Sequence, residues 1–310
     1  MEGIGEFTGV FFYVYCGVGA TAANNIGNLG KIAGIGSLLT VGFAYALGIA
    51  TAVAIAGSNS GGHFNPCVTI SHAVWHGFPW RKVLPFMFFQ ILGAYFACFL
   101  VYGQYRTTLR ELESALIANN MYDQIQFTPN GVAGIFALYT QPGANLRDVF
   151  MNEFFVDFFL GLIIWGAMDP TNFFVSPTVA PWIIGLAYAV MIWDFAPAAS
   201  KHPFSGLVSA NTARDLGARL MAITVWGTKA NGGTYAAISA LTNIPATLLA
   251  TFVYEVFFTD SSRVLPMAQQ DFLNGHKAHL DHKKLDPSQR ITSSTHGSTE
   301  KASFQAVDGV

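Results

Sequence analysis

The sequence has 310 residues, of which 52% are hydrophobic and only 11% are charged. Soluble domains carry about 25% charged residues, so this composition excludes an ordinary soluble domain and is typical of a membrane protein. A formal net charge of −2 gives no sign of a nucleic-acid partner. The three cysteines and eight histidines show no metal-ligand spacing, and no nucleophile–base pair stands out. We therefore expect no enzyme activity, no cofactor and no metal site.

Six apolar segments are long enough to cross a bilayer, which takes about 20 residues. They cover about residues 5–23, 35–56, 83–103, 149–168, 179–196 and 233–258. The first begins almost at Met1 and contains Glu6, so we expect a turn or more of helix upstream. The loop after the third segment opens with a helix-like stretch at 107–118 and ends with a semi-apolar piece at 131–141. We expect that piece to fold over the outer mouth of the protein.

Two short polar stretches each start a helix that is too short to span the membrane. In the first, Asn65 is a predicted N-cap and Pro66 the first residue of a helix that ends near Trp75. The second starts at Asn211. A helix that begins at membrane depth without a full span is a re-entrant half-helix, which is tolerated only inside protein or beside a watery cavity. Two of them suggest a pore.

The two halves of the sequence repeat each other. Glu6 and Glu153 are 147 residues apart, and Asn65 and Asn211 are 146 apart. Each half has three spans, so the second half inserts upside down. We predict an all-α polytopic membrane protein with six transmembrane helices and two re-entrant half-helices in an inverted repeat. Its parts are the first repeat at 1–103 with a half-helix at 65–75, a connecting loop at 104–147, the second repeat at 148–258 with a half-helix at 211–221, and a polar, mostly disordered tail at 259–310.

The chain resembles the aquaporin and aquaglyceroporin channels, the major intrinsic proteins, over about residues 5–258. The resemblance is carried by the Gly-Gly-His-Phe-Asn-Pro run at 61–66, the Asn-x-Ala-Arg-Asp run at 211–215, the paired Glu residues and the six spans. The family usually has Asn-Pro-Ala twice, whereas this chain has Cys67 after the first proline and Thr212 in place of the second. Threonine still permits a helix start, so we expect the geometry to survive.

The resemblance implies roles for residues at the centre of the protein. The central constriction would consist of Asn65, Pro66, Cys67, Asn211, Thr212 and Ala213. Both Asn side chains could be mere helix caps. In paired half-helices, however, their amides would donate to each passing molecule while the positive helix N-termini repel cations. His63 would be a hydrogen-bonded residue of the inner pore wall, and Glu6 and Glu153 would be structural acids that hold the re-entrant loops.

A selectivity filter is expected on the outer side, around Arg214. One interpretation gives this arginine no more than a structural role, in which it pairs with Asp215 or caps a helix. An arginine at membrane depth is costly, however, and usually marks a pathway. Counting from the Asn residues gives Tyr45 and Val208 as further filter positions. Counting along span five gives Ile192, whereas counting back from Asn211 gives Ala198 or Ala199.

Other polar residues are less easily placed. Asp157 and Asp194 are either buried or line a vestibule, and His72 and His76 are packing or surface residues. Asp215 and Arg219 are four residues apart on one helix face and can pair. By resemblance, that pair is similar to the glycerol-conducting branch of the family.

The sequence thus predicts a passive channel for small neutral solutes, glycerol and water, that excludes protons and ions. The expected filter has no histidine on span five and a mainly apolar wall, which suits a polyol. A strict water channel is the alternative, as is a non-conducting adhesion or scaffold protein on the same fold. The resemblance also implies a homotetramer in the lipid bilayer of the plasma membrane. Positive charges lie on both sides, so placing both termini in the cytoplasm also depends on the resemblance.

Overall fold

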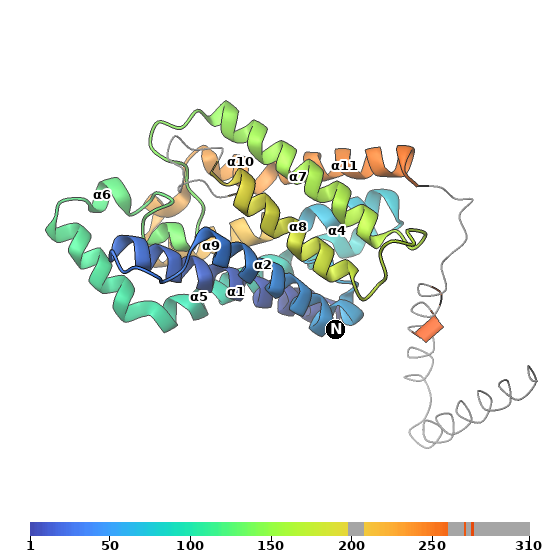
Figure 1. The fold of residues 1–310 in the computed structure, drawn as a ribbon, viewed down its shortest axis with the longest axis horizontal. Coiled ribbons are helices and arrows are strands. Elements are labelled where there is room, and N and C mark those ends of the chain that lie inside the picture. The colour runs from blue at the N-terminus through green and yellow to red at the C-terminus, as the bar shows by residue number, and fades with distance from the viewer. Residues whose placement is uncertain (198–207, 260–269, 271–273, 276–310) are drawn as a thin grey trace, which may run out of the picture. The chain divides into compact units, whose positions relative to one another are not determined.

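The structure is a computed structural model that describes residues 1–197, 208–259, 270 and 274–275. The regular elements in these ranges are all helices (Figure 1). The chain divides into two units, and the helices discussed below belong to the first, residues 1–169 and 178–259. Residues 170–177 belong to the second unit. The sequence predictions for Ala198 and Ala199, and for most of the tail after 259, lie outside the described residues.

The longer helices follow the predicted spans and half-helices. They are α1 (Glu2–Leu29), α2 (Leu38–Ala52), α4 (Pro66–Trp75), α5 (Trp80–Ala118), α7 (Leu146–Met168), α8 (Ala180–Phe195), α9 (Thr212–Trp226) and α11 (Asn243–Phe257). Helix α2 continues through a π-helix (Val53–Gly57) into α3 (Ser58–Ser60), and α10 (Tyr235–Leu241) leads directly into α11. A short α6 (Tyr122–Ile125) follows α5.

Within the residues that the structure describes, four helical stretches are long and apolar enough to cross a membrane on their own. These are Leu38–Ser60, Trp80–Ala118, Leu146–Met168 and Tyr235–Phe257. The other two predicted spans are α1, with 28 residues, and α8, with 16. At 1.5 Å per residue α8 is about 24 Å long, somewhat less than the bilayer core of about 30 Å. Together with the half-helices α4 and α9, these give the predicted fold class.

Two helices end later than the sequence predicts. Helix α5 has 39 residues and runs on to Ala118, so the helix-like stretch predicted at 107–118 is part of the third span. Residues 104–118 contain no proline, so nothing of that kind ends the helix at residue 103, where the predicted span ends. Helix α9 extends five residues beyond the predicted end at 221. It stops before Gly227, whose positive φ of 75° suits a helix end.

Small residues let the helices approach closely. A Cβ on Gly93 of α5 would lie 2.4 Å from the backbone oxygen of Phe7 in α1. A Cβ on Gly185 of α8 would lie 2.5 Å from the backbone oxygen of Ala46 in α2. Such close backbone contacts are typical of packing between helices in membranes. They bring α1 close to α5 and α2 close to α8.

Candidate pore

The half-helices α4 and α9 each begin at an asparagine that caps them. Asn65 Oδ1 accepts a hydrogen bond from the backbone N–H of Cys67 at 3.2 Å. Asn211 Oδ1 accepts from the N–H groups of Ala213 at 2.8 Å and Arg214 at 3.1 Å. Both Asn residues have extended backbone, as an N-cap requires. The helix starts that the sequence predicts are therefore set by these side chains.

The amide nitrogens of the same two side chains join the half-helices to each other. Asn65 Nδ2 donates to the backbone oxygen of Ala210 at 3.0 Å, and Asn211 Nδ2 donates to that of Phe64 at 2.8 Å. Phe64 and Ala210 have positive φ angles, 48° and 50°, which are uncommon outside glycine. The two halves thus repeat a strained residue at equivalent positions. Each Asn amide has a second N–H for a further partner.

Two buried glutamates hold the loops that precede the half-helices. Glu6 accepts from the backbone N–H groups of His63 at 3.1 Å and Phe64 at 2.7 Å, using one oxygen for each. Glu153 accepts from those of Ser209 at 2.7 Å and Ala210 at 3.1 Å through a single oxygen. Buried backbone donors need such partners, because no water competes for them. Each loop is therefore held by a glutamate of its own half of the chain, at equivalent positions in the two halves.

A cavity of about 80 Å³ lies where the half-helices meet. Its wall includes Asn65, Asn211, His63, Phe64 and Ala210. The remaining wall is contributed by Tyr13, Ile49, Val53, Gly62, Val68, Leu160, Ile164, Met168, Ile184 and Tyr188. It is thus mainly apolar, with the two amides and a few further polar groups.

The predicted constriction residues do not all reach this cavity. Pro66, Cys67, Thr212 and Ala213 are buried in the first turns of their helices and are not among the described residues of the wall. Thr212 instead donates through Oγ1 to Asn243 Oδ1 at 2.6 Å. These four residues therefore contribute to the packing and starts of the half-helices rather than to the cavity surface.

His63 does lie on the wall and is held from two sides. Its Nδ1 is 3.2 Å from Thr69 Oγ1, and its ring stacks on that of His72 with centroids 4.6 Å apart. His76, one turn further, lies 2.8 Å from Glu255 through its Nε2. The three histidines form a row from the cavity wall to the surface.

Arg214 is fully enclosed, with 3% of its surface exposed. Its Nε and Nη2 each donate to Tyr45 Oη at 3.1 Å, and its Nη1 donates to the backbone oxygen of Phe136 at 2.8 Å. Three of its five N–H groups are thus engaged, which leaves two. Ile192 and Val208 are also buried, in the same apolar cluster as Tyr45.

Part of the connecting loop at 104–147 is buried against Arg214 and Arg219. Residues 131–139 are all buried, and the expectation that 131–141 folds over the outer mouth stays a prediction. The backbone oxygen of Leu138 accepts from Arg219 Nη2 at 3.1 Å, as that of Phe136 does from Arg214. Arg219 also forms the predicted ion pair with Asp215, at 2.6 Å. Sequence reasoning missed the carbonyl partners, because a backbone contact carries no residue signature.

The two aspartates that the sequence could not place, Asp157 and Asp194, differ in their burial. Asp194 is exposed, whereas Asp157 is buried at 2% exposure, and neither of its carboxylate oxygens has a hydrogen-bond partner among the described residues. Sequence reasoning also assigned no role to Tyr188 and Tyr13. Tyr188 stands one turn before Ile192, and Tyr13 two turns after Glu6, so helical periodicity could have placed both on inward faces.

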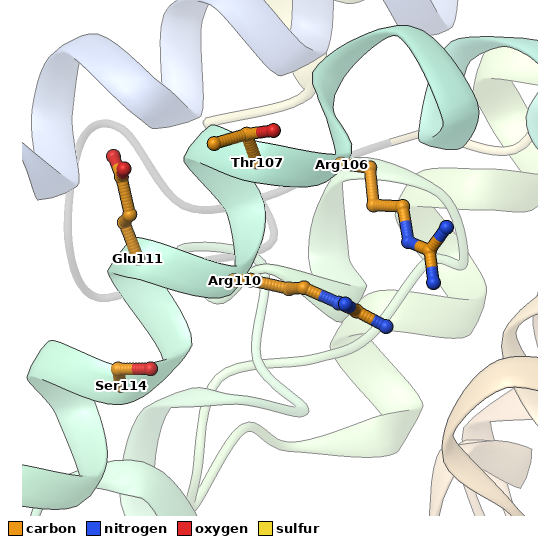
Figure 2. Close-up of a pocket in the computed structure, with 5 residues that line it drawn as sticks. All are labelled: Arg106, Thr107, Arg110, Glu111 and Ser114. Carbon is orange, nitrogen blue, oxygen red and sulfur yellow. The ribbon is translucent and has the colours of Figure 1, made fainter.

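A larger hollow of about 640 Å³ lies along the C-terminal end of α5. It is lined by Arg106, Thr107, Arg110, Glu111 and Ser114. Figure 2 shows both arginines pointing to one side of the helix and Glu111 pointing away from them. These side chains are exposed and do not converge on a common point. The smaller central cavity is therefore the candidate site.

A cavity between two half-helices joined at their capped ends, inside a bundle of apolar helices, defines an integral membrane channel. A family model described as Major intrinsic protein matches residues 1–231. The chain belongs to this family, whose members are channels and not enzymes.

Several relatives are similar over most of the chain. Aquaporin-3 of Laccaria bicolor is 48% identical over 97% of this chain and 89% of its own length. Aquaglyceroporin-2 of Rhizophagus irregularis is 32% identical, over 92% and 83%. The glycerol uptake facilitator protein of Haemophilus influenzae is 31% identical, over 72% and 79%. The solved aquaglyceroporin from Plasmodium falciparum has the same fold, with a TM-score of 0.65 and 22% identity over 83% of this chain and 95% of that one.

Proposed function

We propose that this channel passes glycerol and water and excludes protons and ions. The observation that carries the proposal is the pair of Asn-capped half-helices, joined tip to tip beside a cavity, with the enclosed Arg214 bound to Tyr45. Each half-helix N-terminus carries about half a positive charge. Together with the guanidinium of Arg214, they oppose the entry of cations and hydronium.

The filter composition favours a polyol. The proposed ring consists of Tyr45, Ile192, Val208 and Arg214. Three of these residues present mainly apolar surface on which a carbon chain can lie. The two N–H groups that remain on Arg214 can then donate to hydroxyl oxygens. Relatives named as an aquaglyceroporin and as a glycerol uptake facilitator support the same choice.

A strict water channel is the second candidate, and one observation favours it. The Tyr188 hydroxyl donates to the backbone oxygen of Ser209 at 3.0 Å. That carbonyl would otherwise be an acceptor for a polyol hydroxyl. The bulky Tyr45 and Ile192 also narrow the passage. The first feature engages an acceptor that a polyol would need, and the second reduces the room for anything larger than water.

Light scattering of proteoliposomes distinguishes these functions. The purified protein should speed both the response to an impermeant osmolyte and the uptake of glycerol, relative to empty vesicles. A pH-sensitive dye inside the vesicles should show no added proton flux under an imposed voltage. Faster water flux with glycerol uptake no faster than in empty vesicles would leave the strict water channel. The absence of both fluxes would favour the adhesion or scaffold role.

We also infer a homotetramer in the plasma membrane with both termini in the cytoplasm. These three inferences rest on the resemblance to the family. Chemical crosslinking in membranes would test the tetramer, and protease protection of an epitope fused to Met1 would test the orientation.

A further inference from the structure

Three tyrosine rings meet between the central cavity and Arg214, and we call them the tyrosine collar: Tyr13 on α1, Tyr45 on α2 and Tyr188 on α8. The ring centroids of Tyr13 and Tyr45 are 6.3 Å apart, and those of Tyr45 and Tyr188 are 5.6 Å apart. Tyr13 and Tyr188 line the cavity. Tyr45 instead contacts Arg214. The collar thus connects the cavity wall to the residue that binds Arg214.

The three hydroxyls of the collar differ in their partners. Tyr45 Oη accepts two hydrogen bonds from Arg214, and Tyr188 Oη donates to the Ser209 carbonyl. Tyr13 Oη has no hydrogen-bond partner among the described residues, although the side chain is only 2% exposed. Buried polar groups nearly always have a partner, either protein or water. The partner of Tyr13 therefore has to come from whatever occupies the cavity.

The cavity offers room for such a partner but few acceptors. A buried water needs a cavity of about 10–15 Å³, so about 80 Å³ holds several waters or a segment of a small polyol. The free N–H groups of Asn65 and Asn211 can only donate, and the carbonyls of Phe64 and Ala210, which each accept from one of those side chains, have one lone pair left. A tyrosine hydroxyl can both donate and accept. Tyr13 thus supplies what the Asn pair lacks.

We propose that Tyr13 is a specificity-determining residue of the pore, whose hydroxyl hydrogen-bonds the hydroxyl groups of a passing polyol between Arg214 and the Asn pair. This inference rests on the proposed glycerol conduction. A polyol carries hydroxyls at fixed spacing along a carbon chain, and in an apolar passage each hydroxyl needs a partner from the wall. A water in single file bonds its neighbouring waters as well. Loss of the Tyr13 hydroxyl therefore affects polyols more than water.

The test compares Tyr13→Phe with the wild type in proteoliposomes. Phenylalanine keeps the ring and removes only the hydroxyl. Glycerol permeability should fall about 3- to 10-fold, which is the factor that one neutral hydrogen bond contributes, while water permeability changes less than about 2-fold. Permeability to 1,3-propanediol, which lacks the middle hydroxyl of glycerol, should fall less than that to glycerol. The glycerol-to-propanediol ratio is therefore the diagnostic quantity.

Tyr15→Phe is the matched control. Tyr15 stands two residues later on the same helix, and its hydroxyl bonds Gln104 away from the cavity. This variant should keep the wild-type ratio. Tyr13→His retains a donor and an acceptor, so its glycerol-to-propanediol ratio should stay within about 2-fold of the wild type. This variant also tests the proposal if Tyr13→Phe folds poorly.

The outcomes separate this inference from the proposed function. If wild type conducts glycerol and Tyr13→Phe shows the same ratio as Tyr15→Phe, the role of Tyr13 is wrong and glycerol conduction stands. The role of Tyr13 would also be contradicted if the glycerol-to-propanediol ratio fell as far in Tyr13→His as in a well-folded Tyr13→Phe protein. If wild type passes no glycerol, both the proposed function and the role of Tyr13 fail.

Discussion

Asn65 and Asn211 each use one side chain for two tasks. The carbonyl end caps the residue's own half-helix, and the amide end bonds the loop of the opposite half. Serine or aspartate would cap a helix equally well. Neither provides the two N–H donors of an amide, of which one crosses to the other half and one remains for the cavity. This double use explains why a residue that would be an ordinary cap in a soluble protein stands twice at the centre of this one.

The two structural acids should respond differently to the same substitution. Glu6 uses both carboxylate oxygens on backbone N–H groups, whereas Glu153 uses a single oxygen for both of its own. In Glu6→Gln, the new amide NH₂ has to face a buried N–H group, which should cost about 1–3 kcal/mol. Glu153→Gln can keep its carbonyl oxygen in place and should cost less. Thermal unfolding of the purified variants would measure the difference.

Glu111→Gln is the control for both, because Glu111 is exposed near the C-terminal end of α5. Its unfolding temperature should match that of the wild type. Equal losses for the Glu6 and Glu153 variants would show that charge, rather than the number of oxygens used, decides stability.

A substitution in the proposed filter should change selectivity. Ile192→His would place a polar ring where the structure has a buried apolar side chain. The histidine would remove the surface on which a carbon chain lies while still bonding water. We expect glycerol flux to fall by a factor of about 10 and water flux by much less. Ile192→Leu, which keeps the size and apolarity, is the control in the same light-scattering assay. A parallel fall of both fluxes would place Ile192 outside the filter.

Some residues of the site can be predicted from the sequence and others cannot. Tyr45 and Arg214 are found by counting and by motif, and the structure joins them by hydrogen bonds. The third partner of Arg214 is a backbone oxygen, that of Phe136, and any residue type can supply one. Tyr13 is a similar case, because an aromatic residue in an apolar span is usually packing. What indicates a functional role for Tyr13 is that its buried hydroxyl has no hydrogen-bond partner among the described residues.

Local signals set the bounds of some elements and leave others open. Helices α4 and α9 start where an Asn cap predicts, and α9 ends at a glycine with positive φ. The sequence predicts a helical stretch that ends at residue 118, where α5 ends, but it does not show that this stretch is continuous with the third span. The π-helix at Val53–Gly57 depends on packing and has no sequence signal.

The Arg219 guanidinium on α9 bonds the buried loop at Leu138 and joins it to three other segments. Arg219 donates to both carboxylate oxygens of Asp215 and to Leu138 O, Ser239 Oγ and Asn231 O. Lysine keeps the charge but has a single nitrogen without the planar fork, so it cannot serve all of these acceptors. Arg219→Lys should leave at least one of them unpaired and destabilise the protein by about 1–3 kcal/mol.

Limited proteolysis between residues 119 and 145, together with thermal unfolding, would measure this effect. Arg106→Lys is the control, since Arg106 is exposed. Faster cleavage in the Arg219 variant alone would support the role of Arg219 in holding the loop. Unchanged cleavage would mean that the apolar contacts of 131–139 suffice.

At the scale of the whole molecule, the inverted repeat can be read from spacing because the same contacts are needed twice. Each half requires an acid to hold a loop and an asparagine to cap a half-helix, so two pairs recur about 146 residues apart. The loop between the halves has no such copy. Its path depends on which carbonyls reach Arg214 and Arg219, and that is a property of the folded chain.

The tail should be dispensable for conduction. The family model matches residues 1–231, and α11 completes the described bundle at Phe257. Beyond about residue 260 the sequence is polar, rich in histidine, lysine, serine and threonine, and offers little apolar surface to bury. Deleting residues from Gln270 onward should therefore leave water and glycerol permeabilities within about 2-fold of the full chain when normalised to protein content. Size-exclusion chromatography in detergent should give a single symmetric peak for both proteins. Loss of conduction in a truncated protein that still inserts and elutes normally would make the tail a gate or an assembly element of the channel.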